Sequence, residues 1–573
     1  MSDDTKDVKD EVEQSPLHED AATIAGETDV PVGAITGESA LEQKEAKRER
    51  EASTGKYAFL VGAGILLSRI VGLIRQRVFA YYFGASDAKD VFDAAFRIPN
   101  FLQNVFGEGA LSASFIPVYA NLLARARHEE SGRVASAVLT LLALVTSVLV
   151  LIGIIATPVL IDLIAPGFPP DKQQITIRLV RILFPGAGLL VLSAWCLGVL
   201  NSHRRFFLSY TAPVIWNIAI IAGLVFYGGR VGQYDLALIA GWASVVGSAL
   251  QFLVQLPTVL KLIHHLRPVF DFTSEAVRTV LKNFMPVFVS RGVVQISAYI
   301  DSLLASFLGT GAVGALGYTQ SLYTLPVSLF GMSVSAAELP AMSSALGNQQ
   351  EVEQQLRKRL DAGLRQIAFF IVPSSMAFLA LGDVITGALY QTGKFDRGAT
   401  FYVWSILAGS AVGLLASTLG RLYSSTYYAL HDTRRPLVFA IVRVILTTVL
   451  GYLFALPLPR ALGVDPKWGA AGLTASAGIA GWVEFLLLRR TLNRRIGQTG
   501  LPFAFTVKLW AAAATGAAVG WGLKLLIGVR HPIPVAALVL GAYGLVYFGI
   551  TTLLGIPEAR TVVRRITRIV LRK

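Results

Sequence analysis

Long apolar segments recur along the chain from about residue 57 to residue 555, and they constrain the fold more than any other feature. Each of fourteen such segments is long enough to cross the roughly 30 Å hydrocarbon core of a bilayer. A chain in hydrocarbon must satisfy its own backbone polar groups, so these segments are predicted to be membrane-spanning helices. Their approximate ranges are 57–83, 90–123, 134–164, 175–201, 209–228, 236–260, 279–307, 313–341, 361–389, 400–430, 434–456, 468–492, 503–527 and 532–555. The sequence therefore predicts an all-α polytopic membrane protein.

The charged residues are segregated along the chain, which has a net charge of +14. Residues 1–55 hold 15 acidic and 6 basic residues, and the rest of the chain holds 22 acidic and 45 basic ones. The acidic, aromatic-poor segment 1–55 is predicted to be a disordered tail. The basic excess lies in the membrane part, where it orients loops, and we do not expect nucleic-acid binding. The single cysteine, Cys196, excludes a disulfide framework.

Basic residues gather in every second loop, whereas the intervening loops are short and nearly neutral. The basic loops contain Arg125, Arg127, Arg133, Arg204, Arg205, Lys261, Arg267, Arg357, Lys358, Arg359, Arg434, Arg435, Arg489 and Arg490, among others. By the positive-inside rule, these loops and both termini are predicted to be cytoplasmic. In the basic segment 559–573, apolar residues alternate with arginines, which predicts an amphipathic helix lying on anionic membrane lipids.

An internal repeat is visible in three pairs of similar segments, separated by 222, 223 and 230 residues. The pairs are Ser68-Arg69 with Ser290-Arg291, the segment ending at Pro117 with the one ending at Pro340, and the segment around Arg204 with the one around Arg434. Nearly equal offsets predict two six-helix lobes of the same orientation, related by an axis along the membrane normal. We assign the lobes to residues 56–265 and 266–498, and two further helices to 499–558.

Three arginines lie in the first predicted span. At a rise of about 1.5 Å per residue, Arg69 falls near mid-bilayer, and Arg77 lies close enough to the outer surface to extend its charge into it. Arginines inside a membrane helix are costly, so they are retained mainly where they line a polar cavity or a transport path. We therefore expect Arg69 and Arg75 to face a cavity.

Polar residues in the second span are spaced 3, 4, 7 and 4 residues apart, which confines them to an arc of about 60° on a regular helix. They are Asp90, Asp93, Arg97, Asn104 and Glu108. A continuous polar stripe on a membrane helix predicts a cavity wall. The intramembrane polar groups of the second lobe are sparser, and they are Arg291, Gln295, Asp301 and Gln320.

Several segments of the chain are similar to segments of a known protein family. They are S-R-I-V-G-L-I-R at 68–75, F-R-I-P-N-F-L at 96–102, F-G-E-G-A-L-S-A-S-F-I-P at 106–117, L-Y-Q-T-G-K-F-D at 389–396 and Y-A-L-H-D-T-R-R-P at 428–436. Together with the span count, they resemble the MurJ family of lipid II flippases. That family belongs to the multidrug/oligosaccharidyl-lipid/polysaccharide exporter superfamily, and the resemblance covers residues 57–555.

The resemblance implies alternating access in the bacterial cytoplasmic membrane. An undecaprenyl-diphosphate-linked peptidoglycan precursor, lipid II, would enter a cationic cavity from the inner leaflet and leave to the outer leaflet for cell-wall synthesis. Its lipid tail would run along a groove made by residues 499–558, and the cell-wall synthesis machinery would be a partner. No cofactor is implied, and coupling to Na⁺, H⁺ or the membrane potential stays open, with Asp301 as the candidate coupling residue.

Matching the family position by position gives the expected site residues. Arg69 and Arg75 match its first-helix arginines, Asp90 its acidic residue at the start of the second helix, and Glu108 the glutamate of its E-G-A segment. The chain departs from the family at Gln76, where an acidic residue is common, and at Gln103 and Gln320, where arginines are common, so two substrate-facing cations are missing. The expected substrate-binding set is Arg69, Arg75, Asp90, Arg97, Gln103, Asn104, Glu108, Arg291 and Gln320.

Other functions remain open on the sequence. Because cavity charges are missing at three positions, the chain is also compatible with a flippase for another polyprenyl-linked glycan, a drug or cation antiporter of the same superfamily, or a non-transporting cell-wall scaffold. An enzyme is not expected, because the histidines lie in the tail or near loops and no H-E-x-x-H or phosphate-binding loop motif occurs.

Overall fold

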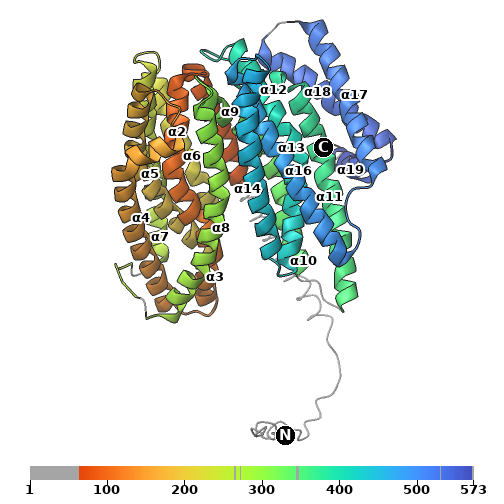
Figure 1. Cartoon of the computed structure of the whole chain (residues 1–573). Helices are drawn as coiled ribbons and strands as arrows, with labels where there is room; N and C mark the ends of the chain where they lie inside the picture. The colour runs from red at the N-terminus through yellow and green to blue at the C-terminus, as the bar shows by residue number, and fades with distance from the viewer. Residues whose placement is uncertain (1–62, 264–265, 272, 344–347, 529–530, 571–573) are drawn as a thin grey trace, which may run out of the picture. The chain divides into compact units, whose positions relative to one another are not determined.

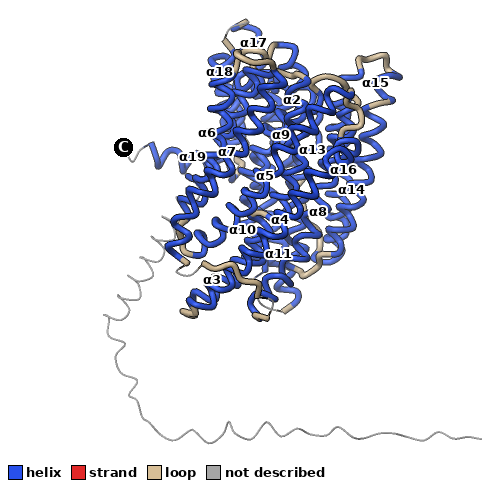
Figure 2. The backbone as a smooth tube through the Cα atoms, turned by 90° about the vertical axis from the view of Figure 1, so that its left-hand side faces the viewer, coloured by secondary structure: helices blue, strands red, loops and turns tan. Residues whose placement is uncertain are grey.

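The described residues fold almost entirely into α-helices (Figure 2). The computed structural model describes residues 63–263, 266–271, 273–343, 348–528 and 531–570, so the predicted tail 1–55 lies outside them. The first helix is described over residues 63–83. It is followed by α2 (Asp87–Phe106), α3 (Glu108–Ala124), α4 (His128–Ile164), α5 (Pro170–Ser202), α6 (Phe206–Tyr227), α7 (Gln233–Leu262), α8 (Glu275–Ser306), α9 (Ala312–Pro326), the π-helix η1 (Val327–Met332), α10 (Ser333–Ser343), α11 (Gln349–Ala380), α12 (Gly382–Tyr390), α13 (Arg397–Ala429), α14 (Arg434–Ala455), α15 (Pro457–Ala461), the 3₁₀ helix η2 (Pro466–Trp468), α16 (Gly469–Ile496), α17 (Phe503–Ile527), α18 (Pro532–Leu553) and α19 (Pro557–Val570).

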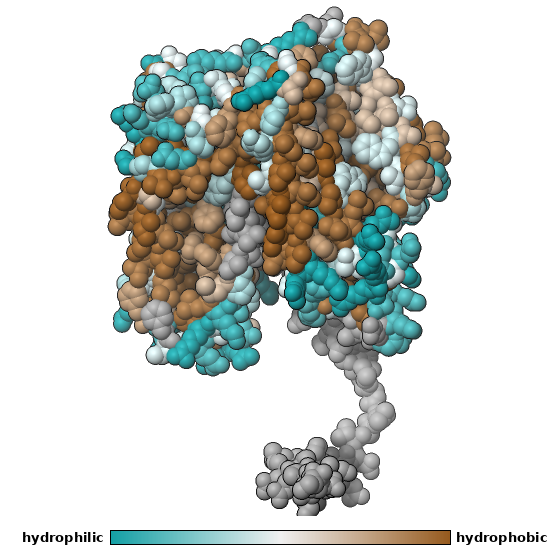
Figure 3. Space-filling view, in the orientation of Figure 1, coloured by the Kyte–Doolittle hydropathy of each residue, from teal (hydrophilic) through white to brown (hydrophobic). Residues whose placement is uncertain are grey.

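Within the described ranges, eleven helices are long and apolar enough to cross a membrane, judged by length and composition. The three predicted spans outside this set, which are helix 63–83, α2 with α3, and α8, all contain charged residues. Figure 3 shows a broad apolar band on the surface with hydrophilic residues at both ends. The prediction of an all-α polytopic membrane protein is confirmed.

The helices pack into two groups (Figure 1). The first group consists of helix 63–83 and α2 to α7, in which α5 packs against α2, α4 and α7, and α6 packs against α7. In the second group, α13 packs against α11 and α16, and α14 packs against α16. Helices α17 and α18 pack against each other and extend the second group through α11 and α12.

Helix α8 contacts both groups, although its sequence position assigns it to the second repeat. Its first half packs on α3 and on the end of α2, where the Phe106 ring lies 5.6 Å from the Phe284 ring and 5.4 Å from the Phe288 ring. Its last turns contact α14, where Leu304 lies against Gly451. The helix therefore links the two groups along their length.

The two groups meet at the end of the bundle that carries Gly84 and Gly311, here called the outer end. The Lys394 amide donates to the Tyr81 carbonyl at 2.9 Å, and the Tyr318 hydroxyl donates to the Gly84 carbonyl at 3.2 Å. Gly84 (φ +62°) and Gly311 (φ +82°) are left-handed, and a Cβ on either would collide with a facing carbonyl. At the opposite, inner end, Figure 3 shows the surface hollowed between the groups.

Three of the turns at the inner end are closed by non-glycine residues with left-handed backbone. They are Ala126 (φ 57°), Arg204 (φ 59°) and His431 (φ 56°), at the ends of α3, α5 and α13. In each turn the next amide bonds to a carbonyl five residues earlier, as in Arg205 to Leu200 at 2.8 Å and Asp432 to Tyr427 at 2.9 Å. The turns at Arg204 and His431 fall in two segments that the sequence repeat had paired.

Candidate functional site

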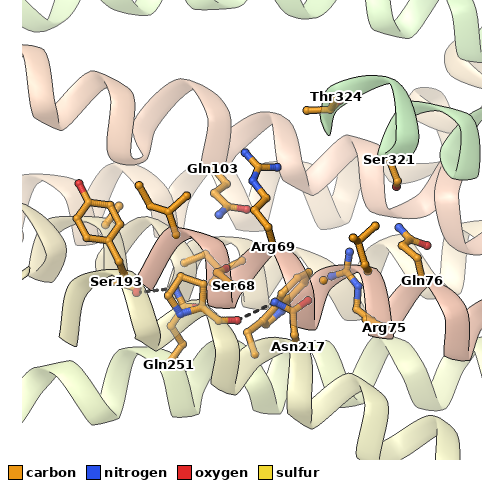
Figure 4. Close-up of a pocket in the computed structure, with 18 of the residues that line it drawn as sticks. Ser68, Arg69, Arg75, Gln76, Gln103, Ser193, Asn217, Gln251, Ser321 and Thr324 are labelled. Carbon is orange, nitrogen blue, oxygen red and sulfur yellow. Dashed lines mark hydrogen bonds between the residues drawn. The ribbon is translucent and has the colours of Figure 1, made fainter. Parts of the chain in front are cut away.

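A cavity of about 820 Å³ lies between the two groups (Figure 4). Its wall is formed by helix 63–83, α2, α5, α6 and α7 on one side, and by α9 with the end of η1 on the other. The sequence-predicted residues Arg69, Arg75, Gln103 and Gln320 all line it. The break between α9 and α10 at η1 brings Met332 to the same wall.

Arg69 and Arg75 are the charged residues of this cavity wall. The Arg69 side chain is exposed to the cavity, and Figure 4 shows it directed away from Asn217 and Gln251. Arg75 is half-buried, and its guanidinium carbon lies 4.6 Å from the centre of the Trp216 ring. The buried Nε of Arg75 has no hydrogen-bond partner within the described structure, so this guanidinium retains a donor for a ligand.

A smaller cavity of about 180 Å³ adjoins the first one, and Arg75, Gln76 and Gln320 line both. It adds Lys89, Asp93 and Arg97 to the lining. Lys89 Nζ pairs with Asp93 Oδ2 at 2.5 Å and lies 4.5 Å from the centre of the Tyr318 ring.

The two cavities together are strongly cationic. Their lining carries four basic side chains, Arg69, Arg75, Lys89 and Arg97, and one acidic side chain, Asp93. Charges in a low-dielectric interior are screened less than in water, so an anion gains more there than at the surface. Guanidinium groups bind phosphate oxygens in pairs, which makes a phosphate or diphosphate a chemically matched ligand.

The three glutamines that distinguish the sequence, Gln76, Gln103 and Gln320, lie in the cavity lining. The Gln320 side chain is exposed, and its Nε2 donates to Thr324 Oγ1 at 3.1 Å. Gln103 and Gln320 stand where the family commonly has arginines and lower the positive charge of the lining, whereas Gln76 stands where an acidic residue is common; all three retain hydrogen-bonding capacity. The unexpected cation is Lys89, which the sequence interpretation did not consider.

Asp90, expected in the binding set, does not line either cavity. Its side chain is fully buried at the outer end, where its two oxygens accept hydrogen bonds from the Gly311 and Gly314 amides at 2.7 Å each. Lys172 Nζ, from α5, lies 2.7 Å from Asp90 Oδ2 and 2.7 Å from Asp87 Oδ1. Asp90 thus accepts three hydrogen bonds at the closed outer end, and those from Gly311 and Gly314 hold the two groups together there. In this structure Asp90 therefore lies away from both cavities, and its role in substrate binding stays a prediction.

Of the remaining expected residues, those with described side chains, Asn104 and Asp301, line neither cavity. Asn104 is half-buried and lines neither cavity, and the predicted stripe is interrupted at Gly107, where α2 ends before α3 begins. The side chains of Glu108 and Arg291 lie outside the described part of the chain. Asp301 is half-buried on α8, and its Oδ1 has no hydrogen-bond partner among the described atoms. Across the described ranges, no three histidine, cysteine or carboxylate groups are placed to hold a metal ion.

Several cavity residues were missed by the sequence interpretation, namely Ser193, Trp216, Asn217 and Gln251. They lie on α5, α6 and α7, within segments that read as plain apolar spans. The amide side chains of Asn217 and Gln251 in the middle of such spans could have indicated the cavity, because polar groups inside membrane helices are costly and tend to be functional.

Comparison with known proteins gives a consistent result. The family described as "Lipid II flippase MurJ" matches residues 79–530. A protein from Burkholderia cenocepacia named "Lipid II flippase MurJ" is 33% identical over 513 residues, which is 86% of this chain and 96% of that protein. The chain superposes with a TM-score of 0.71 on a structure titled "Lipid II flippase MurJ, inward closed conformation", at 26% identity over 87% of this chain and 98% of the other.

A second solved structure extends the likeness of fold. An inward-facing multidrug resistance MATE family transporter of the MOP superfamily gives a TM-score of 0.60 at 17% identity, over 74% of this chain and 95% of the other. At that identity, the likeness concerns the fold alone.

Proposed function

This chain belongs to the MurJ family of lipid II flippases, and on that premise we propose that it moves lipid II from the inner to the outer leaflet of the bacterial inner membrane for cell-wall synthesis. Members of this family are membrane transporters rather than enzymes. The proposal concerns the substrate and the direction of transport, with both termini in the cytoplasm.

The observation that carries the proposal is the pair of arginines in the large cavity. Arg69 and Arg75, both on helix 63–83, line a volume of about 820 Å³ between the two helix groups. Lipid II carries a diphosphate between its tail and its disaccharide-pentapeptide. A diphosphate offers several oxygens to two guanidinium groups, and charge-assisted bonds of this kind are roughly twice as strong as neutral ones.

Alternating access is supported by the difference between the two ends. The groups are joined at the outer end by Asp90, Gly84 and Lys394, whereas the surface is hollowed at the inner end (Figure 3). A headgroup would therefore enter from the inner leaflet in this state. The long tail would stay in lipid along α17 and α18, whose exposed leucines include Leu526 and Leu545.

Complementation of a depleted host tests the proposal. The lipid II flippase of a bacterial host is depleted, the full chain is expressed, and both growth and outer-leaflet lipid II are measured. Rescue by the chain is expected. Normal membrane expression without rescue would overturn the proposal for that host.

Two arginine variants sharpen this test. Arg75→Ala should abolish rescue, because it removes charge-assisted hydrogen bonds of about 1.5–3 kcal/mol each from the substrate. Arg230→Ala removes an exposed arginine from the loop after α6 and should leave rescue intact. Equal tolerance of both changes would contradict the assignment of the diphosphate to this cavity.

A further inference from the structure

A set of uncharged polar side chains lies in the cavity wall formed by α5, α6 and α7. Ser193, Asn217 and Gln251 all line the cavity and are only 2%, 5% and 8% exposed. We call these three residues the neutral patch. Burying polar groups in a membrane protein is unfavourable unless they are hydrogen-bonded, so their placement requires an explanation.

The hydrogen bonds within the neutral patch leave several groups available. Gln251 Nε2 donates to Ser193 Oγ at 3.0 Å, and Gln255 Nε2 donates to the same oxygen at 2.6 Å (Figure 4 draws the first). Ser193 accepts from both amides, which leaves its own hydroxyl hydrogen for a third partner. The network therefore orients Ser193 and Gln251 at the cavity surface without using all of their capacity.

Asn217 has an acceptor with no partner. Its Nδ2 donates to the Pro213 carbonyl at 2.9 Å, which fixes the amide, and its buried Oδ1 has no hydrogen bond within the described structure. Buried polar atoms are nearly always hydrogen-bonded, and Asn217 lines the cavity, so a donor on a ligand would satisfy this acceptor.

The neutral patch adjoins the cationic part of the cavity at Trp216. This residue precedes Asn217, and its Nε1 donates to Ser244 Oγ at 3.1 Å. The guanidinium carbon of Arg75 lies over its ring, 4.6 Å from the ring centre. A single ligand with an anionic group on Arg75 would therefore have its adjacent uncharged portion at the neutral patch.

From this juxtaposition we propose that the neutral patch is a saccharide subsite, which binds the sugar next to the diphosphate of a polyprenyl-linked glycan. The proposal rests on the proposed function and specifies how the headgroup is recognised. Sugar hydroxyl and acetamido groups supply both the donors that Asn217 Oδ1 lacks and the acceptors that Ser193 can use. A free carboxylate, such as those of a stem peptide, would be buried there without a cation, which disfavours the peptide at this position.

Binding measurements with two lipids separate the sugar from the diphosphate. The full chain in nanodiscs is titrated with lipid II and with undecaprenyl diphosphate, which lacks the sugar. Wild type should bind lipid II more tightly. Asn217→Leu and Gln251→Leu should each weaken lipid II binding by about 10-fold and leave undecaprenyl diphosphate binding unchanged, whereas Arg75→Ala should weaken both.

Gln255→Leu is the matched control. Gln255 lies one turn after Gln251 on α7 and bonds to the same Ser193, but it does not line the cavity. It should reduce the preference for lipid II less than Gln251→Leu does, because Gln251 still donates to Ser193. If Gln255→Leu reduced that preference as much as Gln251→Leu, the effect would come from packing and the subsite would be refuted. Asn217→Ser, which retains an oxygen, is used if the leucine variant does not fold.

The outcomes also distinguish the subsite from the proposed function. Wild type binding both lipids equally would overturn the subsite, and complementation would still test the flippase. Preference for another polyprenyl-diphosphate glycan over lipid II would overturn the proposed substrate, and the subsite would stand if Gln251→Leu removed that preference. No binding of any of these lipids would overturn both.

Discussion

Replacing Asp90 by alanine is expected to open the outer end of the transporter. The fully buried carboxylate accepts hydrogen bonds of 2.7 Å from the Gly311 and Gly314 amides of α9 and from Lys172 Nζ. Asp87 is the matched control, because it is also 2.7 Å from Lys172 but its side chain is 40% exposed.

The burial of the two carboxylates determines the expected magnitudes. Removing one partner of a buried ion pair costs about 3–5 kcal/mol, and Asp90→Ala also leaves two amides unpaired. Removing an exposed partner, as in Asp87→Ala, costs about 1 kcal/mol or less. Because the bonds of Asp90 to α9 exist only while the groups touch, their loss acts on the equilibrium between closed and open states. The two amide bonds to the carboxylate, at about 1.5–3 kcal/mol each, together amount to at least about 3 kcal/mol, which shifts that equilibrium by more than 100-fold.

Distance measurements between spin labels would detect the opening. Cysteines introduced at Arg230 and Asp465, which are exposed at the outer end of the first and second group, are labelled in the full chain. The native Cys196 is fully buried, so it contributes little label and becomes reactive only if the protein unfolds. Asp90→Ala should add a longer-distance population that Asp87→Ala lacks. Identical distance distributions, with Cys196 still protected, would refute the reasoning.

Three further outcomes are expected. Ala126→Gly should stabilise the protein by about 1 kcal/mol in thermal unfolding, because Ala126 has a φ of 57° that glycine adopts without strain, and a loss of stability would contradict this. Arg77→Ala should lower the unfolding free energy by about 2 kcal/mol, since Arg77 Nη1 donates to two α12 carbonyls at 2.7 and 2.9 Å, and an unchanged midpoint would refute it. Burial, followed by the charges of His128 and Arg205, lowers the pKa of His203 below its ordinary value of 6.5. As the pH falls, His203 is therefore protonated in the unfolded chain before it is protonated in the folded one. The free energy of unfolding should accordingly decrease as the pH drops below 6.5. His203→Gln should flatten this pH dependence, and an unchanged slope would exclude His203 as its cause.

The sequence predicted the helical spans and the cavity arginines because both follow from local physics. A segment in hydrocarbon has few alternatives to a helix, and the charges of Arg69 and Arg75 cannot face lipid there without a large cost. Their first-span position therefore indicated a polar interior, and both line the cavity. Gln103 and Gln320, at which the chain differs from the family pattern, line the cavity as well.

Long-range partners could not be predicted from local patterns. Periodicity placed Asp90 on one face of its helix, but the choice between the cavity and α9 depends on Gly311, which is 221 residues away. Arg77 was expected to extend to the outer surface, and instead it bonds to carbonyls 311 and 312 residues away. Asn217 carries no charge, and an uncharged amide in an apolar span is a weaker signal of function than an ionised side chain.

The closure at the outer end depends largely on main-chain atoms. Asp90 bonds to two amides, Tyr318 to the Gly84 carbonyl, and the Lys394 amide to the Tyr81 carbonyl. Replacing the side chain of a residue whose backbone amide donates, or whose backbone carbonyl accepts, leaves that half of the bond in place, provided that the backbone keeps its path. The cavity, by contrast, is lined by side chains such as Gln76 and Gln320. Mutations of the cavity lining can therefore change which substrate is preferred without changing the equilibrium between the closed and open outer end. Substrate selectivity and closure can then evolve as separate traits.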